Sequence, residues 1–288
     1  MENKCQAQNN ASGNILDVKS VSVRFGGLVA VNNVTLHHCG GEILSLIGPN
    51  GAGKTTIFNL LTGIYQPDGG RIHFMGRDIT SMHPHERVRV GIARTFQNIR
   101  LFTGLTVLEN LLIAHPGCNR ERILPSVILS PAMRSRRRRI IEECEEILQM
   151  VGLLDQQKLL STSLPYGKQR LLEIGRAMAT DPSLILLDEP GAGMNAMEKE
   201  ELTALIRHIT QVCKKHVLFI EHDMRFVMGI SDRIIVLDHG EKIAEGTASE
   251  IQNNQQVIEA YLGRAHSSDP DAEYDWTADR GPAASERV

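Results

Sequence analysis

A glycine-rich segment between Gly48 and Thr56 has the residue types and the order of a phosphate-binding loop. It reads Gly-Pro-Asn-Gly-Ala-Gly-Lys-Thr-Thr. Glycines allow backbone N–H groups to converge on phosphate oxygens, Lys54 adds a positive charge, and the Thr55 hydroxyl can bind Mg²⁺. The pattern predicts that the chain binds ATP or GTP together with Mg²⁺. The predicted nucleotide-binding residues of the loop are Asn50, Gly51, Gly53, Lys54, Thr55 and Thr56.

The segments on either side of this loop fit the same interpretation. The apolar run Ile43–Ile47 precedes it, as a buried strand would, and an amphipathic stretch from Thr56 to Leu61 follows it and ends at Gly63. A helix that begins at the loop turns its N-terminus toward the phosphates, which favours anions. A chance glycine-rich turn with a solvated lysine is the alternative, but such a turn does not require this order of strand, loop and helix.

Two carboxylates follow a second apolar run. Ser183–Leu187 is short and has the composition of a buried parallel strand, and Asp188 and Glu189 come directly after it. Ligands bind at the carboxyl ends of parallel strands, so we expect both side chains beside the phosphates. Asp188 is predicted to hold Mg²⁺ through its water shell, and Glu189 is predicted to polarise the attacking water as general base.

A histidine ends a third apolar run. Val217–Ile220 is followed by Glu221 and His222, and an imidazole at this position could reach the γ-phosphate and the attacking water. A histidine at the end of a strand is more often structural than catalytic. Only the phosphate loop and the two carboxylates favour a catalytic role for His222.

With these motifs in this order, the chain resembles the nucleotide-binding subunits of ATP-binding cassette (ABC) transporters over Leu16–Gly263. The resemblance implies that the ring of Phe25 stacks on adenine; without it, an aromatic residue of an edge strand is an equal interpretation. It also implies that Gln97 senses Mg²⁺ and the attacking water, and that His222 is the switch histidine. ATP is then the expected nucleotide. The implied catalytic residues are Glu189, His222 and Gln97, and the implied metal-binding residues are Thr55, Gln97 and Asp188.

The signature loop of this family is altered here. It reads Leu-Ser-Gly-Gly-Gln at the start of a helix in the family, and Leu-Pro-Tyr-Gly-Lys from Leu164 to Lys168 in this chain. The serine hydroxyl that binds the γ-phosphate of the partner's ATP is therefore missing, whereas Gly167 is retained. Because Pro165 suits a helix start, the helix dipole and the amides near Gly167 can still face a phosphate. Gly167 and Lys168 are accordingly expected to contact nucleotide.

The altered signature is similar to that of branched-chain amino acid importers of the Liv type. Further segments resemble the LivG-like subunit of these importers: Arg24–Asn33, Arg94–Gln97, Leu101–Phe102, Thr106–Asn110, Glu221–Met224 and Glu259–Gly263. The D-loop ends in Asn195, where the family usually has aspartate, and LivG-like chains share this trait. A charge is therefore expected to be missing at the contact between subunits.

The resemblance implies an α/β fold of the two-lobed ABC type. Such a fold combines a P-loop NTPase (RecA-like) core with an antiparallel β subdomain and an inserted α-helical subdomain. The expected parts are a disordered polar tail over 1–13, the core over 14–97 and 183–263, the helical subdomain over 98–182, and a disordered tail over 264–288.

Two features of the expected insertion are interpreted as structural. Apolar residues at helical spacing, such as Leu148 and Val151, predict a buried helix face. The run Arg134–Arg139 could contact anionic lipid or nucleic acid. However, Arg138 precedes Glu142 by four positions, and this spacing fits an ion pair on a solvated helix.

Composition excludes several classes of protein. The chain has 288 residues and 42% hydrophobic residues, which is typical of a globular protein, and no apolar stretch reaches the roughly 18 to 20 residues that span a bilayer. Its polar first residues lack a signal-peptide core, so we expect it to stay in the cytoplasm. Five cysteines without C-x-x-C spacing predict neither disulfides nor zinc. A net charge of −3 gives nucleic acid no general attraction.

The resemblance also implies the function and the partners. The chain is expected to be the ATP-hydrolysing motor subunit of an importer for branched-chain, hydrophobic amino acids. It would associate peripherally with the cytoplasmic face of the bacterial inner membrane and form a dimer with a second, LivF-like ATPase. The other expected partners are two membrane permease subunits and a periplasmic solute-binding protein. Nucleic acid is not expected to be a partner.

Three other functions are compatible with parts of the pattern. ABC ATPases that act on nucleic acid usually carry paired cassettes, long coiled coils or basic extensions, and the sequence shows none of these. A nucleotide-binding regulator without turnover would lack the base, whereas Glu189 and His222 are both present. An importer of urea or short amides stays open, because only its solute-binding protein distinguishes it from an amino acid importer.

Overall fold

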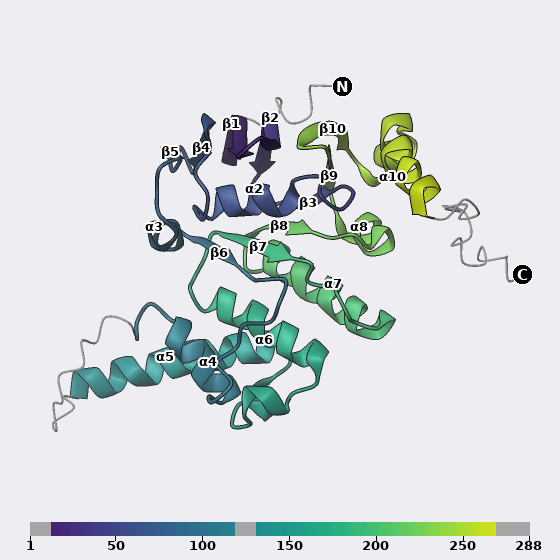
Figure 1. The fold of residues 1–288 in the computed structure, drawn as a ribbon. Helices are drawn as coiled ribbons and strands as arrows, with labels where there is room; N and C mark the ends of the chain where they lie inside the picture. Colours follow the sequence, from purple (N-terminus) through teal and green to yellow (C-terminus); the bar gives the residue numbers. More distant parts are fainter. Residues whose placement is uncertain (1–12, 119–130, 269–288) are drawn as a thin grey trace, which may run out of the picture.

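The structure is a computed structural model that describes residues 13–118 and 131–268 (Figure 1). The disordered tails predicted for residues 1–13 and 264–288 lie outside these ranges, apart from Gly13 and the residues up to 268. In the described part, two β-sheets form the upper half of the molecule in Figure 1, and helices cover the lower half.

The larger sheet is the central element of the fold. Its strand order is β10–β9–β3–β8–β7–β6. The strands are β3 (Ile43–Ile47), β6 (Ile92–Arg94), β7 (Leu184–Asp188), β8 (His216–Ile220), β9 (Arg233–Asp238) and β10 (Glu241–Gly246). Five of them are parallel, and β10 pairs antiparallel with β9 at one edge. Because the parallel strands share one direction, the segments that follow β3, β7 and β8 emerge at one edge of the sheet.

The smaller sheet is antiparallel and has the order β2–β1–β4–β5. Its strands are β1 (Asn14–Phe25), β2 (Leu28–Cys39), β4 (Gly69–Phe74) and β5 (Arg77–Asp78). Helix α2 (Lys54–Leu61) lies between the two sheets in Figure 1. Leu36 of the small sheet, Leu46 of the large sheet and Phe58 of α2 belong to one buried cluster, so α2 joins the sheets.

Helices account for most of the remaining described residues. They are α3 (Pro84–Arg89), α4 (Val107–Ala114), α5 (Pro131–Met150), α6 (Tyr166–Met178), α7 (Ala196–Gln211), α8 (Met224–Ile230), α9 (Ala248–Gln252) and α10 (Gln255–Ser268), with two short 3₁₀ turns, η1 (Leu154–Gln156) and η2 (Ser161–Ser163). Helices α6, α7 and α8 share a second buried cluster with the opposite face of the large sheet. The sheet therefore separates this group from α2.

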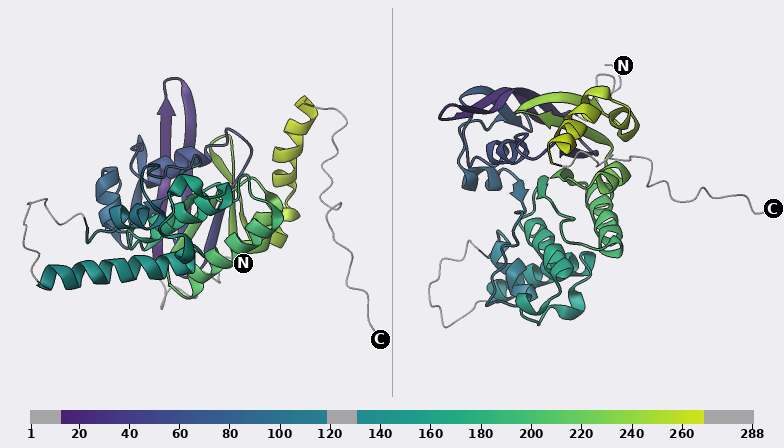
Figure 2. Two further views of the ribbon diagram at one scale, coloured as in Figure 1. Left: turned by 90° about the horizontal axis from the view of Figure 1, so that it is seen from below. Right: turned by 45° about the vertical axis from the view of Figure 1, so that its right-hand side comes forward.

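Helices α4, α5 and α6 lie within the range that was predicted to be a helical insertion, and Figure 2 shows them gathered in a lobe below the sheets. The predicted stripe residues Leu148 and Val151 are buried there. Arg138 contacts Glu142 at 3.1 Å on the exposed side of α5, as the spacing of the pair predicts. An exposed pair of this kind contributes little to stability.

The last described helix, α10, continues past residue 263, where the predicted core ends. It is anchored because the Val257 side chain is buried in the cluster beneath the large sheet and Tyr261 packs against the same cluster. Together these elements form the α/β core, the antiparallel sheet and the helical lobe that the resemblance implies. No helix in the described ranges combines the length and the apolar content that crossing a bilayer requires.

Candidate nucleotide-binding site

The phosphate loop connects β3 to α2 at the carboxyl edge of the large sheet. Gly53 caps α2 with a φ of 98°, and no side chain caps the helix there. A side chain at Gly53 would be strained in this left-handed conformation, and its β-carbon would lie 2.7 Å from the backbone oxygen of Ala30. A helix that begins without a side-chain cap, directly after a glycine-rich loop, has the arrangement of an anion-binding helix start.

Lys54 folds back into the loop. Its Nζ donates hydrogen bonds to the backbone oxygens of Gly48 at 2.6 Å and Pro49 at 3.0 Å, and the residue is 9% exposed. Around this ammonium group, Asn50, Gly51 and Thr55 are exposed, and Gly53 and Thr56 are half-buried. The loop therefore presents one buried positive charge together with polar groups that solvent and a phosphate chain can reach.

Asp188 ends β7, and its carboxylate is buried in an ion pair. Oδ2 of Asp188 lies 2.7 Å from Nη2 of Arg94, and the two side chains are 5% and 7% exposed. The other terminal nitrogen of Arg94 donates to Asn59 Oδ1 of α2 at 2.7 Å. The guanidinium group therefore ties the predicted metal ligand to the helix of the phosphate loop. Sequence reasoning missed Arg94, although a charge at the end of a buried strand is a usable signal.

Glu189, Gln97 and His222 are brought together at the same edge. Nε2 of Gln97 donates to Oε2 of Glu189 at 2.9 Å, and Nδ1 of His222 lies 3.8 Å from the same oxygen. Glu189 has a φ of 49°, which is uncommon for a residue with a side chain and occurs often at functional sites. The structure thus places the three predicted catalytic residues around one carboxylate oxygen, with the His222 ring exposed to solvent.

Glu221 is a second residue of this edge to which the sequence assigned no role. Its side chain is 1% exposed and accepts hydrogen bonds from the backbone N–H groups of Gly191 at 2.7 Å and His222 at 3.1 Å. Burial raises the pKa of this carboxyl group, and the hydrogen bonds from Gly191 and His222 oppose the rise. Glu221 connects the backbone that follows Glu189 to the backbone of His222.

Phe25 lies at the end of β1, and the residue is 42% exposed. The ring of Tyr65 packs edge-on against it, with the ring centres 4.9 Å apart. β1 lies between β2 and β4, but its pairing with β4 ends at Ser22, so Phe25 pairs with Leu28 of β2 alone and has the edge position that the alternative interpretation expects. An exposed ring held by a second aromatic side chain is suited to stacking on a base.

Gly167 and Lys168 of the altered signature do not belong to the phosphate loop of their own chain. They lie in the first turn of α6, on the opposite side of the large sheet from α2 (Figure 1). Tyr166, which stands where the family has glycine, lies against the D-loop, since a β-carbon on Gly193 would be 3.0 Å from its ring. Asn195 caps α7 by accepting from the N–H of Glu198 at 3.0 Å, a role that aspartate fills equally well.

The donors at the sheet edge suit Mg²⁺. Thr55 and Asp188 offer hydroxyl and carboxylate oxygens, and Gln97 offers an amide oxygen; Mg²⁺ prefers such hard ligands. Within the described residues, no group of three or more His, Cys, Asp and Glu side chains could hold a metal ion alone.

Comparisons with known families and proteins agree with this geometry. Residues 31–192 match the family model described as ABC transporter, which includes the phosphate loop, the signature and the carboxylate pair. Residues 241–267 match a second model, described as branched-chain amino acid ATP-binding cassette transporter. The second match covers β10, α9 and most of α10.

Individual proteins are similar over nearly their full length. LivG of Salmonella typhimurium, a high-affinity branched-chain amino acid transport ATP-binding protein, is 46% identical over 251 residues, which are 87% of this chain and 98% of LivG. BraF of Pseudomonas aeruginosa, which has the same description, is 45% identical with the same coverage. The crystal structure of the ADP conformation of an ATP-binding cassette from an ABC transporter aligns with a TM-score of 0.76 at 31% identity, over 87% of this chain and 99% of that one.

Proposed function

Because the chain belongs to the ATP-binding subunits of ABC transporters, we propose that it hydrolyses ATP to drive an importer of branched-chain amino acids. The observation that carries the substrate class is the match of residues 241–267 to the branched-chain amino acid family, on a chain whose residues 31–192 match the ABC transporter family. LivG and BraF, which are similar over the same length, are themselves branched-chain amino acid transport proteins.

In the proposed reaction, the loop amides and Lys54 bind the phosphates and Phe25 binds the base. Glu189 takes the proton of the attacking water, and His222 and Gln97 hold Glu189 and the water in place. These roles rest on the contacts that Gln97 and His222 make with one oxygen of Glu189. Mg²⁺ would be held by Thr55, Asp188 and Gln97, and when bound it neutralises negative charge on the phosphate oxygens.

We infer that Gly167 and Lys168 face the nucleotide bound by a partner subunit, since they lie across the sheet from their own phosphate loop. A β-carbon at Gly167 would overlap the carboxylate of Glu198, so a side chain there also disturbs its own chain. The test compares the double variant Gly167→Asp/Glu198→Ala with the single variant Glu198→Ala. Both variants lack the Glu198 carboxylate, so the overlap within the chain does not contribute to the difference between them.

Gly167→Asp/Glu198→Ala is expected to reduce ATP turnover by about 100-fold or more, because the added carboxylate repels the partner's phosphate. ATP affinity at the variant's own loop should stay within about threefold of the Glu198→Ala control, since the loop lies elsewhere. Both quantities follow from nucleotide titration and phosphate release. A parallel loss of affinity and turnover would contradict the assignment of Gly167 to the partner's site.

The proposed assembly is a heterodimer with a second, LivF-like ATPase, two permease subunits and a periplasmic solute-binding protein. It would sit on the cytoplasmic face of a bacterial inner membrane. Lys168 and Asn195 stand at positions that the family uses at the dimer contact, and both differ from the family in charge. A distinct partner can bring a compensating acid to this contact, whereas a second copy brings only the residues of this chain.

The experiment is reconstitution of the chain with the candidate partners in vesicles, with uptake measured for leucine, isoleucine, valine and urea. We expect ATP-dependent uptake of the three amino acids, and we expect it to require the second ATPase. The Glu189→Gln variant provides the uptake-negative control and, with Mg²⁺ and ATP, allows the mass of the dimer to be measured. Uptake of urea alone would assign the chain to an importer of urea or short amides. Stable homodimers that support uptake would contradict the heterodimer.

A further inference from the structure

The signature helix α6 carries a buried ion pair that no part of the proposed reaction uses. Nη1 of Arg170 lies 3.1 Å from Oε2 of Glu173, one turn further along the helix, and the two side chains are 2% and 1% exposed. Burying two charges is costly, and an apolar pair of similar volume is often as stable. The pair therefore calls for an explanation other than core packing.

The two side chains bind the backbone of the segment that contains Gln97. Arg170 donates to the backbone oxygen of Phe96 at 2.6 Å and to that of Gln97. Glu173 Oε1 accepts from the N–H groups of Phe96 at 3.5 Å and Arg100 at 3.3 Å. Several peptide groups of residues 96–100 are thus hydrogen-bonded to one helix, by groups whose charges neutralise each other.

The attachment of the chain changes abruptly before this segment. The N–H of Thr95 donates to the backbone oxygen of Leu186 at 3.0 Å, so Thr95 still belongs to the large sheet. The backbone groups of Phe96, Gln97 and Arg100 are bonded to side chains of α6 instead. Gln97 itself is exposed, and its side chain reaches back to Glu189 at 2.9 Å. Its position against Glu189 is therefore set by the helix that begins with the signature.

We propose that Arg170 and Glu173 are positioning residues for the ATPase reaction: they hold the backbone of Gln97 to the signature helix, so that Gln97 follows α6 and not the large sheet. The inference rests on the proposed role of Gln97 beside Glu189. Since the first turn of α6 carries Gly167, the pair connects the surface assigned to the partner's nucleotide with the chain's own catalytic edge. Glu173 and Arg170 themselves do not reach the reacting atoms.

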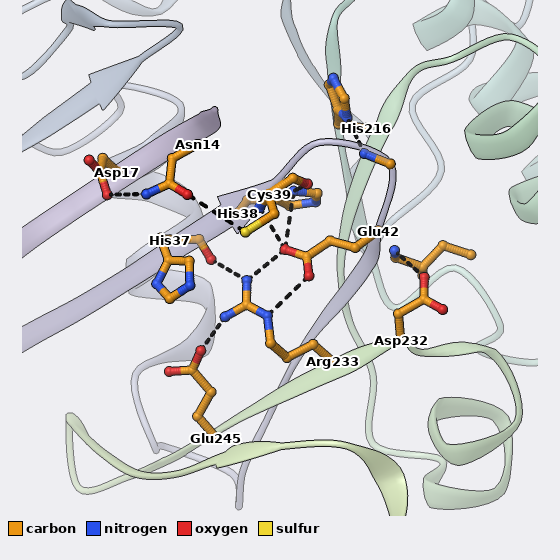
Figure 3. Close-up of polar contacts among 12 residues, drawn as sticks. Asn14, Asp17, His37, His38, Cys39, Glu42, His216, Asp232, Arg233 and Glu245 are labelled. Atoms are coloured by element: carbon orange, nitrogen blue, oxygen red, sulfur yellow. Dashed lines mark hydrogen bonds and ion pairs between the residues drawn. The ribbon is translucent and has the colours of Figure 1, made fainter. Parts of the chain in front are cut away.

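The test removes both charges together. A single buried charge left without its partner would destabilise the whole fold, and that effect would hide a change in the position of Gln97. Arg170→Leu/Glu173→Leu keeps good helix-forming residues in α6. The matched control is Glu42→Leu/Arg233→Leu. It removes a less buried ion pair, with atoms 2.6 Å apart, at the opposite edge of the large sheet, where β3 and β9 begin (Figure 3). Glu245, the second acidic partner of Arg233, keeps its ion pair with Lys242.

The first measurement is amide hydrogen exchange of the nucleotide-free protein. In Arg170→Leu/Glu173→Leu, a peptide covering residues 96–100 is expected to exchange at least about fivefold faster, because the N–H groups of Phe96 and Arg100 lose their acceptor. The control should leave that peptide unchanged. Unchanged exchange at 96–100 in the α6 variant would overturn the proposal, whether or not the protein hydrolyses ATP.

The second measurement separates positioning from general damage. In the full ATPase assembly, Arg170→Leu/Glu173→Leu should lower kcat by about 10- to 100-fold and leave KM for ATP within about threefold, since misplacing a catalytic group costs rate and not binding. Combined with Gln97→Ala, it should cost nothing beyond Gln97→Ala alone. Losses that multiply, or a KM that rises as kcat falls, would overturn the proposal.

A milder variant covers the case in which the double variant does not fold. Arg170→Lys keeps the charge, but a single ammonium group cannot donate to the Phe96 and Gln97 oxygens with the geometry of a guanidinium fork. We expect an intermediate increase in exchange at residues 96–100 and an intermediate loss of kcat. Exchange and kcat equal to those of the unaltered protein would overturn the proposal. An unaltered assembly without ATPase activity would instead refute the proposed function.

Discussion

Replacing Glu189 by glutamine is expected to reduce ATP turnover by about 10²- to 10⁴-fold while ATP binding is retained. Glutamine has nearly the same size and can still accept the hydrogen bond that Glu189 receives from Gln97 at 2.9 Å. It cannot take a proton from water at neutral pH. The variant should therefore accumulate bound, uncleaved ATP, which is measured as nucleotide retained after rapid removal of the free pool.

The matched control for this prediction is Glu142→Gln. It removes the same charge from an exposed ion pair on α5, and turnover should stay within about twofold of the unaltered protein. The base assignment would fail if Glu189→Gln turned over ATP at the normal rate. It would also fail if the variant lost ATP binding, since Glu189 would then contribute to binding ATP and not to the chemical step.

Lys54→Ala is expected to abolish nucleotide binding at ordinary ATP concentrations. Removing one partner of a buried, hydrogen-bonded charge pair costs about 2–5 kcal/mol, which is roughly a 30- to 5,000-fold loss of affinity. In the free protein, the same change removes hydrogen bonds to the backbone oxygens of Gly48 and Pro49 and no contact with phosphate. Calorimetric titration with ATP and thermal unfolding without it separate these two effects.

Lys242→Ala is the control, because this lysine forms a partly exposed ion pair with Glu245 at 2.8 Å on β10, outside the phosphate loop. Its ATP affinity should equal that of the unaltered chain. Lys54→Ala and Glu189→Gln should fail differently: the first in binding, the second in turnover with binding intact. Normal ATP affinity in Lys54→Ala would show that the phosphates bind elsewhere.

The phosphate loop and the Asp188–Glu189 pair could be predicted from the sequence because each is a short contiguous signal. The place of His222 after a strand could be predicted in the same way, but its role came from the other motifs and from the resemblance. An apolar run long enough for a buried strand is followed directly by the residues that the strand delivers to the ligand. The structure has β3, β7 and β8 at these runs. Local composition is sufficient here, since the direction of a buried parallel strand decides where its last residues emerge.

The roles of Gln97 and Phe25 came from the resemblance and not from a local pattern. Neither residue has a neighbour in the sequence that reveals its function. Gln97 meets Glu189 across a separation of 92 positions. That meeting depends on β6 lying beside β7, and strand order is a property of the whole sheet.

Three contacts were decided by the tertiary structure alone. Arg94 reaches Asp188 over 94 positions, Arg170 reaches Phe96 over 74, and Glu198 lies against Gly167. An arginine in an amphipathic helix or at a strand end is expected to be solvated unless an opposite charge is brought to it. Whether such a charge arrives depends on how distant elements pack. The sequence by itself therefore determined where the phosphate loop, the carboxylate pair and the histidine emerge from their strands, and the tertiary structure decided which distant charges hold them, because that depends on how the elements pack.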